Sequence, residues 1–375
     1  MVVFVLLLLL CLFCVLFHVF MFVCWLFSGG FPALILYRVF GVFDCDYFPF
    51  VGFTGFAVRG AFGVALRDLA CVRGGETSCR GCEYRLSCVY YLLFELRSVD
   101  FPGVRFARRG AARGVARPYV VLPVRCCGRD LEFGVVIIAP KYLEYEFMFI
   151  SSFLKMGFLG LGVDPVRHVR RRFRVVEVVR EDPLSGLRQV VYSDEDGYVP
   201  QPLPDCVKVN LLDRVSADSL LDLRPRFVEV RFLTPTQVRY GGVVVEEFPL
   251  VAIVMNLARR YSLLAVFHGV GDPIPTDVAR ELRDWVRDRV KLVFSRFRRV
   301  GLRKFSLKTR QVRDLGSFVL GRFVYEFDPE FWSRRDLAEL AMKLLLVGQY
   351  VGVGQLASAG CGQYVLSVPF RFVRE

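Results

Sequence analysis

The stretch RFVEVRFLTP, residues 226–235, decides the fold because it opens the clearest succession of secondary-structure patterns in the chain. Apolar and charged residues alternate in it, which predicts a half-buried β-strand. The patterns that follow are two helices, two strands, a helix and a strand, at 246–267, 276–290, about 292–306, 318–327, 333–347 and 363–372. Apart from the further helix at 276–290, this is the order of a ferredoxin-like domain: strand, helix, strand, strand, helix, strand.

The first half of the chain is a looser copy of this order. A strand pattern at 33–43 precedes a helix with apolar residues at helical spacing, and a buried strand at 131–140 precedes a second helix. A basic strand at 166–179 follows. We therefore predict an α+β protein with tandem ferredoxin-like (RRM-like) βαββαβ domains and a cysteine-rich insertion that resembles a zinc knuckle.

The boundary between the domains is expected where the composition changes. From Glu181 to about Pro225 the chain is rich in Asp, Pro and Ser, which is typical of a connection. The expected order is an apolar segment, a first domain, a linker and a second domain, at 1–30, 31–200, 201–225 and 226–375.

The apolar segment 1–30 allows two interpretations. No charged residue occurs from Met1 to Tyr37, and the run is long enough to span ~30 Å of hydrocarbon. It lacks a basic start and a small-residue cleavage site, which argues against a removable signal peptide. It is either a membrane anchor or the product of a start assigned upstream of Met21. Both leave the working domains in the cytoplasm, since the first basic residues follow the segment.

The charge of the chain indicates an anionic partner. The 375 residues carry a formal net charge of +13, and Arg greatly outnumbers Lys. Guanidinium groups bind phosphate through two donors, so the bias favours nucleic acid over anionic lipid or an acidic protein. A solvated basic surface without such a partner is the alternative. An apolar content of 54% excludes general disorder.

Four of the twelve cysteines form a set with the spacing C-x7-C-x2-C-x5-C. The central Cys-x-x-Cys pair can direct two thiolates at one ion, which favours a tetrahedral structural Zn²⁺ site. Disulfides or unpaired thiols are the alternatives. The proposed metal ligands are Cys71, Cys79, Cys82 and Cys88.

Basic residues gather in two runs, at 167–174 and 295–313, and Phe297 and Phe305 interleave with the second. Such runs can follow a sugar-phosphate backbone while aromatic rings stack on bases. The glycine loop at 352–362 resembles a dinucleotide-binding loop, but it leaves a helix and enters a strand, which excludes that function. The loop glycines are expected to expose backbone amides to an anionic ligand. Gly63, between Arg59 and Arg67 on one helix, is expected to let a phosphate backbone approach. The expected RNA-binding residues are Arg59, Arg67, Arg170, Arg171, Arg303, Lys304, Lys308, Arg310, Gly352, Gly354, Gly360 and Gly362.

Five motifs in order resemble the CRISPR-associated protein six family of the RAMP superfamily. They are RGAFGVALRDLAC with the cysteine loop, FGVVIIAPKYLEYEFMFISSFLKMGFLGLG, FLTPTQVRYGG, KFSLKTRQVRDLGSFVLG and GVGQLASAGCGQY. The resemblance implies an endoribonuclease that processes CRISPR precursor RNA without a catalytic metal. In that reaction a ribose 2′-hydroxyl attacks the adjacent phosphate and leaves a 2′,3′-cyclic phosphate.

The chain departs from this family at the residues that would transfer protons. Many members have a histidine before the C-terminal glycine loop, where this chain has Gly352, and a lysine where it has Gln355. Histidine suits a general acid or base because its pKa lies near neutrality. The remaining candidates for catalysis are His168, His268, Lys304, Lys308, Tyr47 and Tyr364.

Three functions are therefore open. The first is a repeat-RNA endoribonuclease. The second is a non-catalytic RAMP subunit that binds crRNA together with other CRISPR effector subunits. The third is a membrane-anchored basic protein, which requires the apolar segment to be genuine.

Overall fold

The computed structural model describes residues 34–44, 50, 52–74, 78–101, 115–162, 170–200, 210–306 and 311–369. The chain divides into two units, Met1–Pro32 and Ala33–Glu375, and every described residue lies in the second. The apolar segment 1–30 therefore lies outside the described residues.

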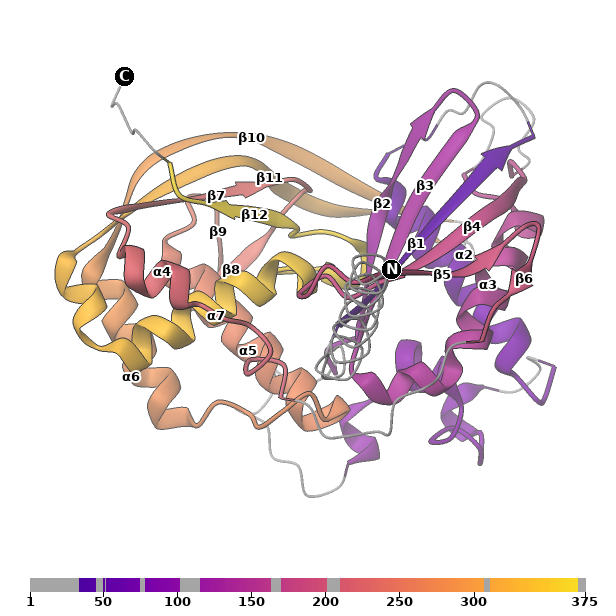
Figure 1. Cartoon of the computed structure of the whole chain (residues 1–375), viewed down its shortest axis with the longest axis horizontal. Coiled ribbons are helices and arrows are strands. Elements are labelled where there is room, and N and C mark those ends of the chain that lie inside the picture. Colours follow the sequence, from indigo (N-terminus) through magenta and orange to yellow (C-terminus); the bar gives the residue numbers. More distant parts are fainter. Residues whose placement is uncertain are drawn as a thin grey trace, which may run out of the picture. The chain divides into compact units, whose positions relative to one another are not determined.

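The first sheet has six antiparallel strands in the order β2-β3-β1-β4-β5-β6. Its strands are β1 Leu34–Phe43, β2 Tyr119–Cys127, β3 Asp130–Ile138, β4 Phe173–Glu181, β5 Arg188–Ser193 and β6 Gly197–Tyr198. Helices α2, Thr54–Ala70, and α3, Glu146–Leu159, connect β1 to β2 and β3 to β4. Strands β1 to β4 with these helices form a ferredoxin-like unit, to which β5 and β6 are added (Figure 1).

The second sheet has the order β10-β11-β7-β12. Its strands are β7 Phe227–Phe232, β10 Val290–Ser306, β11 Gln311–Phe327 and β12 Tyr364–Ser367. The helices are α4 Asp218–Leu223, α5 Leu250–His268, α6 Thr276–Arg289 and α7 Arg335–Val351, and β8 Val238–Tyr240 pairs with β9 Val243–Val245. The strand order 2-3-1-4 in each sheet confirms the tandem ferredoxin-like fold. The expected domain boundaries themselves remain a prediction.

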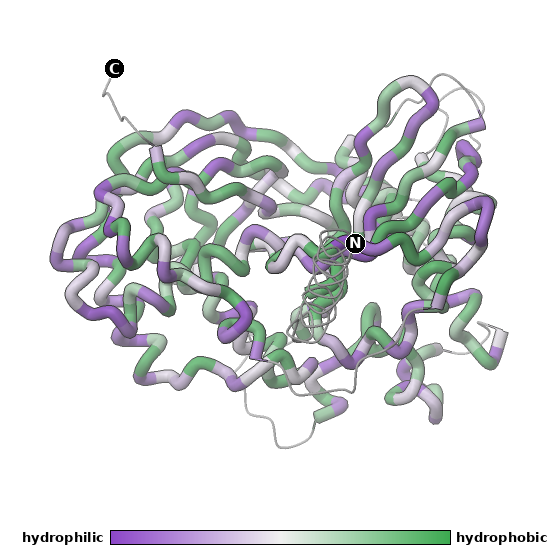
Figure 2. Tube along the Cα trace, viewed as in Figure 1, coloured by the Kyte–Doolittle hydropathy of each residue, from purple (hydrophilic) through white to green (hydrophobic). Residues whose placement is uncertain are grey.

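The cores lie between each sheet and its helices. In the first ferredoxin-like unit, five aromatic side chains are fully buried and in ring contact: Tyr37, Phe62, Phe133, Phe149 and Phe153. Hydrophobic and hydrophilic stretches alternate along the described strands and helices (Figure 2). Among the described helices, α5 is long and apolar enough to cross a membrane, but 67% of its most apolar window is buried inside the protein. Its hydrophobicity is thus that of a core helix.

The segment from Glu181 onward corrects one expectation. Residues 188–198, expected to begin the inter-domain connection, form the hairpin β5–β6 at the edge of the first sheet. Gly197, at φ +74°, supplies the left-handed residue that this tight turn requires. Further along, α4 packs against α7. Residues 201–209 lie outside the described residues.

Candidate functional site

The glycine-rich segment 352–362 packs tightly against the first ferredoxin-like unit. A Cβ added to Gly55, at the start of α2, would lie 2.0 Å from the carbonyl oxygen of Ala359. A Cβ added to Gly360 would lie 2.4 Å from the carbonyl oxygen of Val121 in β2. Both distances are shorter than any van der Waals contact, so glycine is required at both positions. The segment therefore holds α2 and β2 in close register with the C-terminal part of the chain.

This packing corrects the expected role of the loop glycines. Gly352, Gly360 and Gly362 are buried, and their amides donate to the carbonyl oxygens of Gly348, Ala357 and Pro235 at 2.9, 2.8 and 3.1 Å. The expectation that these amides are exposed to an anionic ligand is therefore wrong. Gly354 is partly exposed, and its φ of +82° and its contact with Gln237 require glycine. The glycines position the surrounding side chains.

One of these side chains is the buried phenol of Tyr119. Arg59 of α2 donates from Nε to the Tyr119 hydroxyl at 3.0 Å, and Ser358 of the glycine-rich segment also hydrogen-bonds to that hydroxyl. Burial raises the pKa of Tyr119, so the phenol stays neutral. The Arg59 guanidinium also lies 5.8 Å from the ring centroid of Phe94. Arg59 is thus fixed from two sides.

Lys304 is a second cation near Arg59. It lies on β10 directly opposite Arg313 of β11, and it is half-buried. Burial, followed by the charges of Arg59 and Arg313, lowers the pKa of Lys304. Lys304, Arg59 and Arg313 come from three different elements and form what we call the cation cluster. An amine with a lowered pKa releases a proton more readily than an ordinary lysine, and two guanidinium groups can stabilise a phosphate that gains negative charge.

The remaining part of the α2 surface differs from expectation. Gly63, between Arg59 and Arg67, is buried, and an added Cβ would lie 2.9 Å from the ring of Phe94. This glycine admits an aromatic ring and not a phosphate backbone. Phe94 stacks on Tyr90 with 5.3 Å between centroids, and Arg67 lies 5.9 Å from the centroid of the Tyr90 ring.

Two candidates for catalysis are buried in the core. His268 is 1% exposed, accepts a hydrogen bond from the Tyr142 hydroxyl at Nδ1 and donates from Nε2 to the carbonyl of Ala116, both at 2.8 Å. Burial lowers the pKa of His268 to about 3. Tyr364 is 1% exposed and donates to the carbonyl of Leu345 at 2.6 Å. Neither side chain can reach a substrate from these positions.

The four cysteines of the predicted zinc set line one cavity of about 600 Å³ beside the C-terminal end of α2. Arg67, Arg73 and Arg85 line it too. Each of the four thiols is partly buried and free of disulfides. Within the described ranges, no group of three or more His, Cys, Asp or Glu side chains is already placed to hold an ion. The zinc interpretation therefore remains a prediction.

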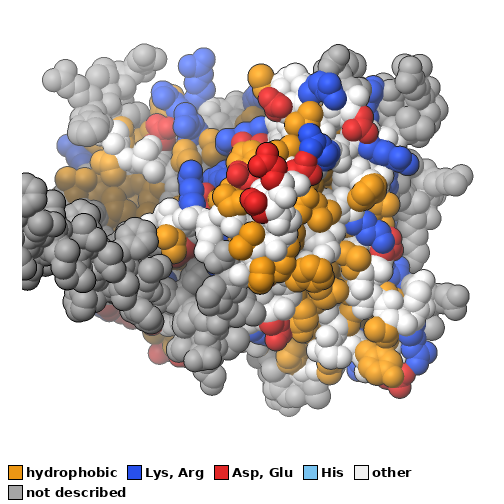
Figure 3. All heavy atoms as spheres, turned by 45° about the vertical axis from the view of Figure 1, so that its right-hand side comes forward, with side chains coloured by type: hydrophobic (Ala, Val, Ile, Leu, Met, Phe, Trp, Pro, Cys, Tyr) orange, Lys and Arg blue, Asp and Glu red, His pale blue; other side chains and the backbone are white. Residues whose placement is uncertain are grey.

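The other predicted site residues lie apart or cannot be placed. Arg170 and Arg171 lie against Gly160, just beyond α3, and Arg303 is exposed on β10 next to Lys304. Tyr47, His168, Lys308 and Arg310 lie outside the described residues. Figure 3 shows Lys and Arg side chains interspersed with hydrophobic ones on one face, with a group of Asp and Glu near the middle and others elsewhere. The basic side chains that are visible on this face do not form one continuous patch.

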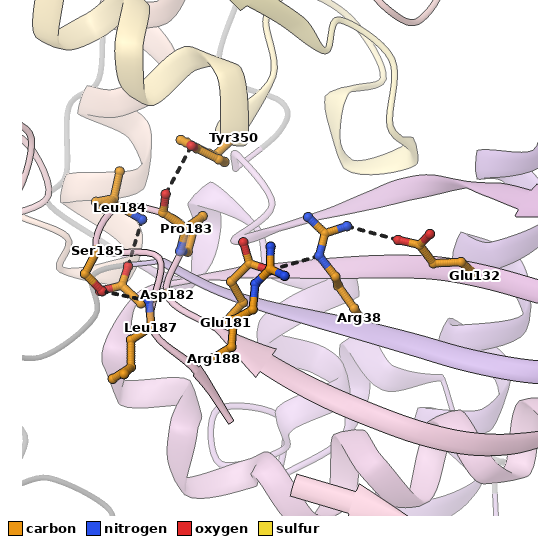
Figure 4. Close-up of polar contacts among 10 residues, drawn as sticks. All are labelled: Arg38, Glu132, Glu181, Asp182, Pro183, Leu184, Ser185, Leu187, Arg188 and Tyr350. Atoms are coloured by element: carbon orange, nitrogen blue, oxygen red, sulfur yellow. Dashed lines mark hydrogen bonds and ion pairs between the residues drawn. The ribbon is translucent and has the colours of Figure 1, made fainter. Parts of the chain in front are cut away.

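Arg38 on the first sheet is paired with carboxylates, whereas no carboxylate among the described residues forms an ion pair with the cation cluster. Arg38 of β1 contacts Glu132 of β3 at 3.0 Å and Glu181 of β4 at 2.9 Å (Figure 4). Arg188 also contacts Glu181, at 3.2 Å. Nearby, the Tyr350 hydroxyl of α7 donates to the carbonyl of Pro183 at 3.1 Å (Figure 4).

Tyr119 and Ser358 are functional residues that no sequence pattern indicates. Tyr119 lies in an ordinary strand pattern and Ser358 in the glycine loop, and nothing local connects them with Arg59. Arg313 belongs to the basic run at 295–313, but only the strand register shows that it faces Lys304.

The fold defines a tandem ferredoxin-like protein with cations gathered beside a glycine-rich loop. Two family models match it: one described as an N-terminal domain over residues 43–203, and CRISPR-associated endoribonuclease Cas6 over residues 230–364. This second match covers about a third of the chain and agrees with the resemblance seen in the sequence. A comparison with curated protein sequences finds no match.

The chain is similar to several solved structures. The product complex of Cas6 (TTHB231) is similar over 89% of this chain and 100% of that chain, with 14% identity and a TM-score of 0.50. A structure of Thermus thermophilus Cas6 (TTHB231) covers 90% of this chain and 100% of that chain, with 13% identity and a TM-score of 0.47. A Cas6-related protein from Pyrococcus furiosus covers 89% and 98%, with 11% identity and a TM-score of 0.40. At 14% identity the first likeness shows the fold alone.

Proposed function

We propose that this protein is a cytoplasmic endoribonuclease that binds CRISPR repeat RNA and processes precursor crRNA without a catalytic metal. The observation that carries the proposal is the convergence of Lys304, Arg313 and Arg59 beside the glycine-rich segment. The family match to an endoribonuclease over residues 230–364 supports it.

The three residues of the cation cluster have different roles in the proposed reaction. The 2′-oxygen forms a bond to phosphorus, the bond from phosphorus to the 5′-oxygen breaks, and the products are a 2′,3′-cyclic phosphate and a 5′-hydroxyl. Lys304 donates a proton to the leaving 5′-oxygen, and water accepts the proton of the 2′-hydroxyl. Arg59 and Arg313 stabilise the negative charge that grows on the phosphate. Tyr119 and Ser358 hold Arg59 in place.

The test measures cleavage of labelled repeat RNA in EDTA by the wild-type protein and by two variants with substitutions on β10. Lys304→Ala should lower the single-turnover rate by about 10²- to 10⁴-fold, the usual contribution of a general acid, while RNA binding persists. Lys291→Ala, at an exposed position on the same strand, is the control and should cleave normally. Tight binding by the wild-type protein without any cleavage would instead identify a non-catalytic RAMP subunit.

We also propose that the cysteine loop binds one structural Zn²⁺. Binding requires the thiolates of Cys71, Cys79, Cys82 and Cys88 to converge into the cavity that they line. Four thiolates on one Zn²⁺ carry a net charge of about −2, and three lining arginines would offset it. No residue described between 71 and 88 is buried, and of the loop only Cys79 and Cys88 are described as packing against a hydrophobic cluster, so little apolar surface orders this loop. A metal would supply the missing stabilisation.

A further inference from the structure

Three arginines lie in one row across three adjacent strands of the second sheet. Arg296 of β10 is opposite Arg322 of β11, and Arg322 is opposite Arg231 of β7. All three side chains are exposed. We call this set the arginine row.

The arginine row lies on the face of the sheet that the helices leave open. The neighbouring pair Phe323 and Val230 is buried, and Phe323 packs against Phe248 just before α5. Successive residues of a strand point to opposite faces, so Arg322 and Arg231 point away from the helices. Arg322 also lies 5.0 Å from the ring centroid of Phe294 on β10.

Such a row destabilises an isolated sheet, because like charges directly opposite each other repel. Within the described part of the chain, none of the three arginines forms an ion pair with a carboxylate. Arg38, on the first sheet, has two such partners (Figure 4). The contrast indicates that the compensating negative charge at the arginine row comes from a ligand.

The dimensions favour a chain of phosphates over a single one. Adjacent strands lie ~4.8 Å apart, so the row extends over about 10 Å, more than one phosphate group can contact. Along β10, Arg296 and Lys304 are eight residues apart, or about 26 Å of strand. One extended RNA can therefore reach from one position to the other.

We propose that the arginine row is a second RNA-binding surface, which holds the phosphate backbone of a single-stranded part of the substrate away from the point of cleavage. This inference rests on the proposed function only for the identity of the RNA. The row contributes affinity and takes no part in the chemical step.

The test compares two triple variants of the full chain. Arg231→Gln/Arg296→Gln/Arg322→Gln removes the row, and Arg280→Gln/Arg287→Gln/Arg335→Gln removes the same charge from exposed positions on α6 and α7. Fluorescence anisotropy between 50 and 300 mM salt follows binding of repeat RNA with a 2′-deoxy residue at the mapped cleavage position. If the wild-type protein does not cleave, unmodified repeat RNA is used.

The row variant should bind RNA roughly 10- to 100-fold more weakly at 0.1 M salt, with a salt slope reduced by about 2, since each phosphate contact contributes ~0.7. Its single-turnover cleavage rate at saturating protein should equal that of the wild type. An affinity and a salt slope equal to those of the control variant would overturn the inference. The arginine row would then be assigned to binding of an acidic protein surface. If the triple variant does not fold, Arg296→Gln alone should reduce the slope by about 0.7, and an unchanged slope would overturn the inference.

The outcome is separable from that of the proposed function. Loss of cleavage in Lys304→Ala tests the chemistry, whereas the salt slope of the row variant tests the second surface. A wild-type protein that binds but does not cleave, with a row variant that binds weakly, would contradict the proposed nuclease and support the arginine row.

Discussion

Lys304 of β10 lies directly opposite Arg313 of β11, so two cations occupy one cross-strand position. A sheet gains nothing from this pair, because opposite like charges repel. Burial of Lys304 and the charge of Arg59 add to the cost of keeping the amine protonated. A bound phosphate would reverse this balance, which is why we place the reaction here.

The pH dependence of cleavage should follow the lysine and not a histidine. His268, with a pKa of about 3, is neutral throughout the range, so the rate should be flat between about pH 6 and 8. Above that, the rate should fall as Lys304 loses its proton, at a pH below the 10.5 of an ordinary lysine. Single-turnover rates from pH 5.5 to 10 measure this. A bell-shaped profile near neutrality that disappears in His168→Ala would show that a histidine acts instead.

His268→Ala should lower stability without a change in the chemistry. It leaves the Tyr142 hydroxyl and the Ala116 carbonyl without their partner, at about 1–3 kcal/mol for each buried group. Urea unfolding at pH 7.5, with cleavage of RNA by the folded variant as the second measurement, checks both. A cleavage rate far below the wild-type value in fully folded His268→Ala would contradict this prediction.

The same histidine should make the wild-type protein sensitive to acid. Its folded pKa of about 3 lies below the unfolded 6.5, so its contribution is complete above pH 6.5 and is lost as the pH falls towards 3. The slope is at most about 1.4 kcal/mol per pH unit. His268→Gln should therefore show a weaker loss of stability between pH 6.5 and 4 than the wild type. Parallel curves for the two proteins would show that His268 does not titrate in this way.

Two glycines of α2 offer a matched comparison. Gly55→Ala should destabilise the protein and disturb the cation cluster, since its Cβ would lie 2.0 Å from the Ala359 oxygen. Gly60→Ala, six residues from the helix start with no atom within 4 Å of its added Cβ, should stabilise the helix by about 0.5–1 kcal/mol. Melting temperatures and cleavage rates distinguish the pair. Equal melting temperatures and cleavage rates for the two variants would mean that the glycine-rich segment can shift to accommodate a methyl group at residue 55.

The cysteine loop should contain about one zinc per chain. Cys82→Ser should lose that zinc and lower the melting temperature, with a smaller effect on the cleavage rate of the folded protein. Elemental analysis of reduced protein and thermal unfolding with and without a chelator measure this, and Cys361→Ser, at a buried position outside the loop, is the control for metal content. Metal-free wild-type protein in which Cys71, Cys79, Cys82 and Cys88 all react with a thiol reagent would exclude the site.

Periodicity predicted the fold well, because each ferredoxin-like unit is built from elements whose buried faces repeat at helix or strand spacing. It failed at β5–β6, where the polar turn from Asp194 to Gly197 resembles a connection although it joins two paired strands. Composition indicates that a segment turns there, but whether the flanking strands pair depends on β4, which is not local.

The site was less predictable, because its contacts join distant parts of the chain. Gly63 was interpreted as room for a phosphate, and nothing near it shows that Phe94 fills that room. The loop glycines were recognised as special, but their φ angles and close contacts serve the protein backbone. Lys304 was one candidate among six, and only the register with Arg313 and the proximity of Arg59 single it out.

The β10–β11 hairpin has a mechanical consequence. Each strand has 17 residues, about 56 Å when extended. Strand β7 pairs only with residues 322–326 of β11. The end of the hairpin that carries Lys304 therefore forms an arm that extends beyond the pairing with β7. The register shifts between Gly301 and Arg303, where Gly316 adopts φ +84°. Deleting one residue on either side of this elbow would turn Lys304 to the opposite face of the arm, because side chains alternate along a strand. The direction in which Lys304, the proposed proton donor, points is thus set by this bend. A shift of one residue would prevent its proposed action although every charged group is retained.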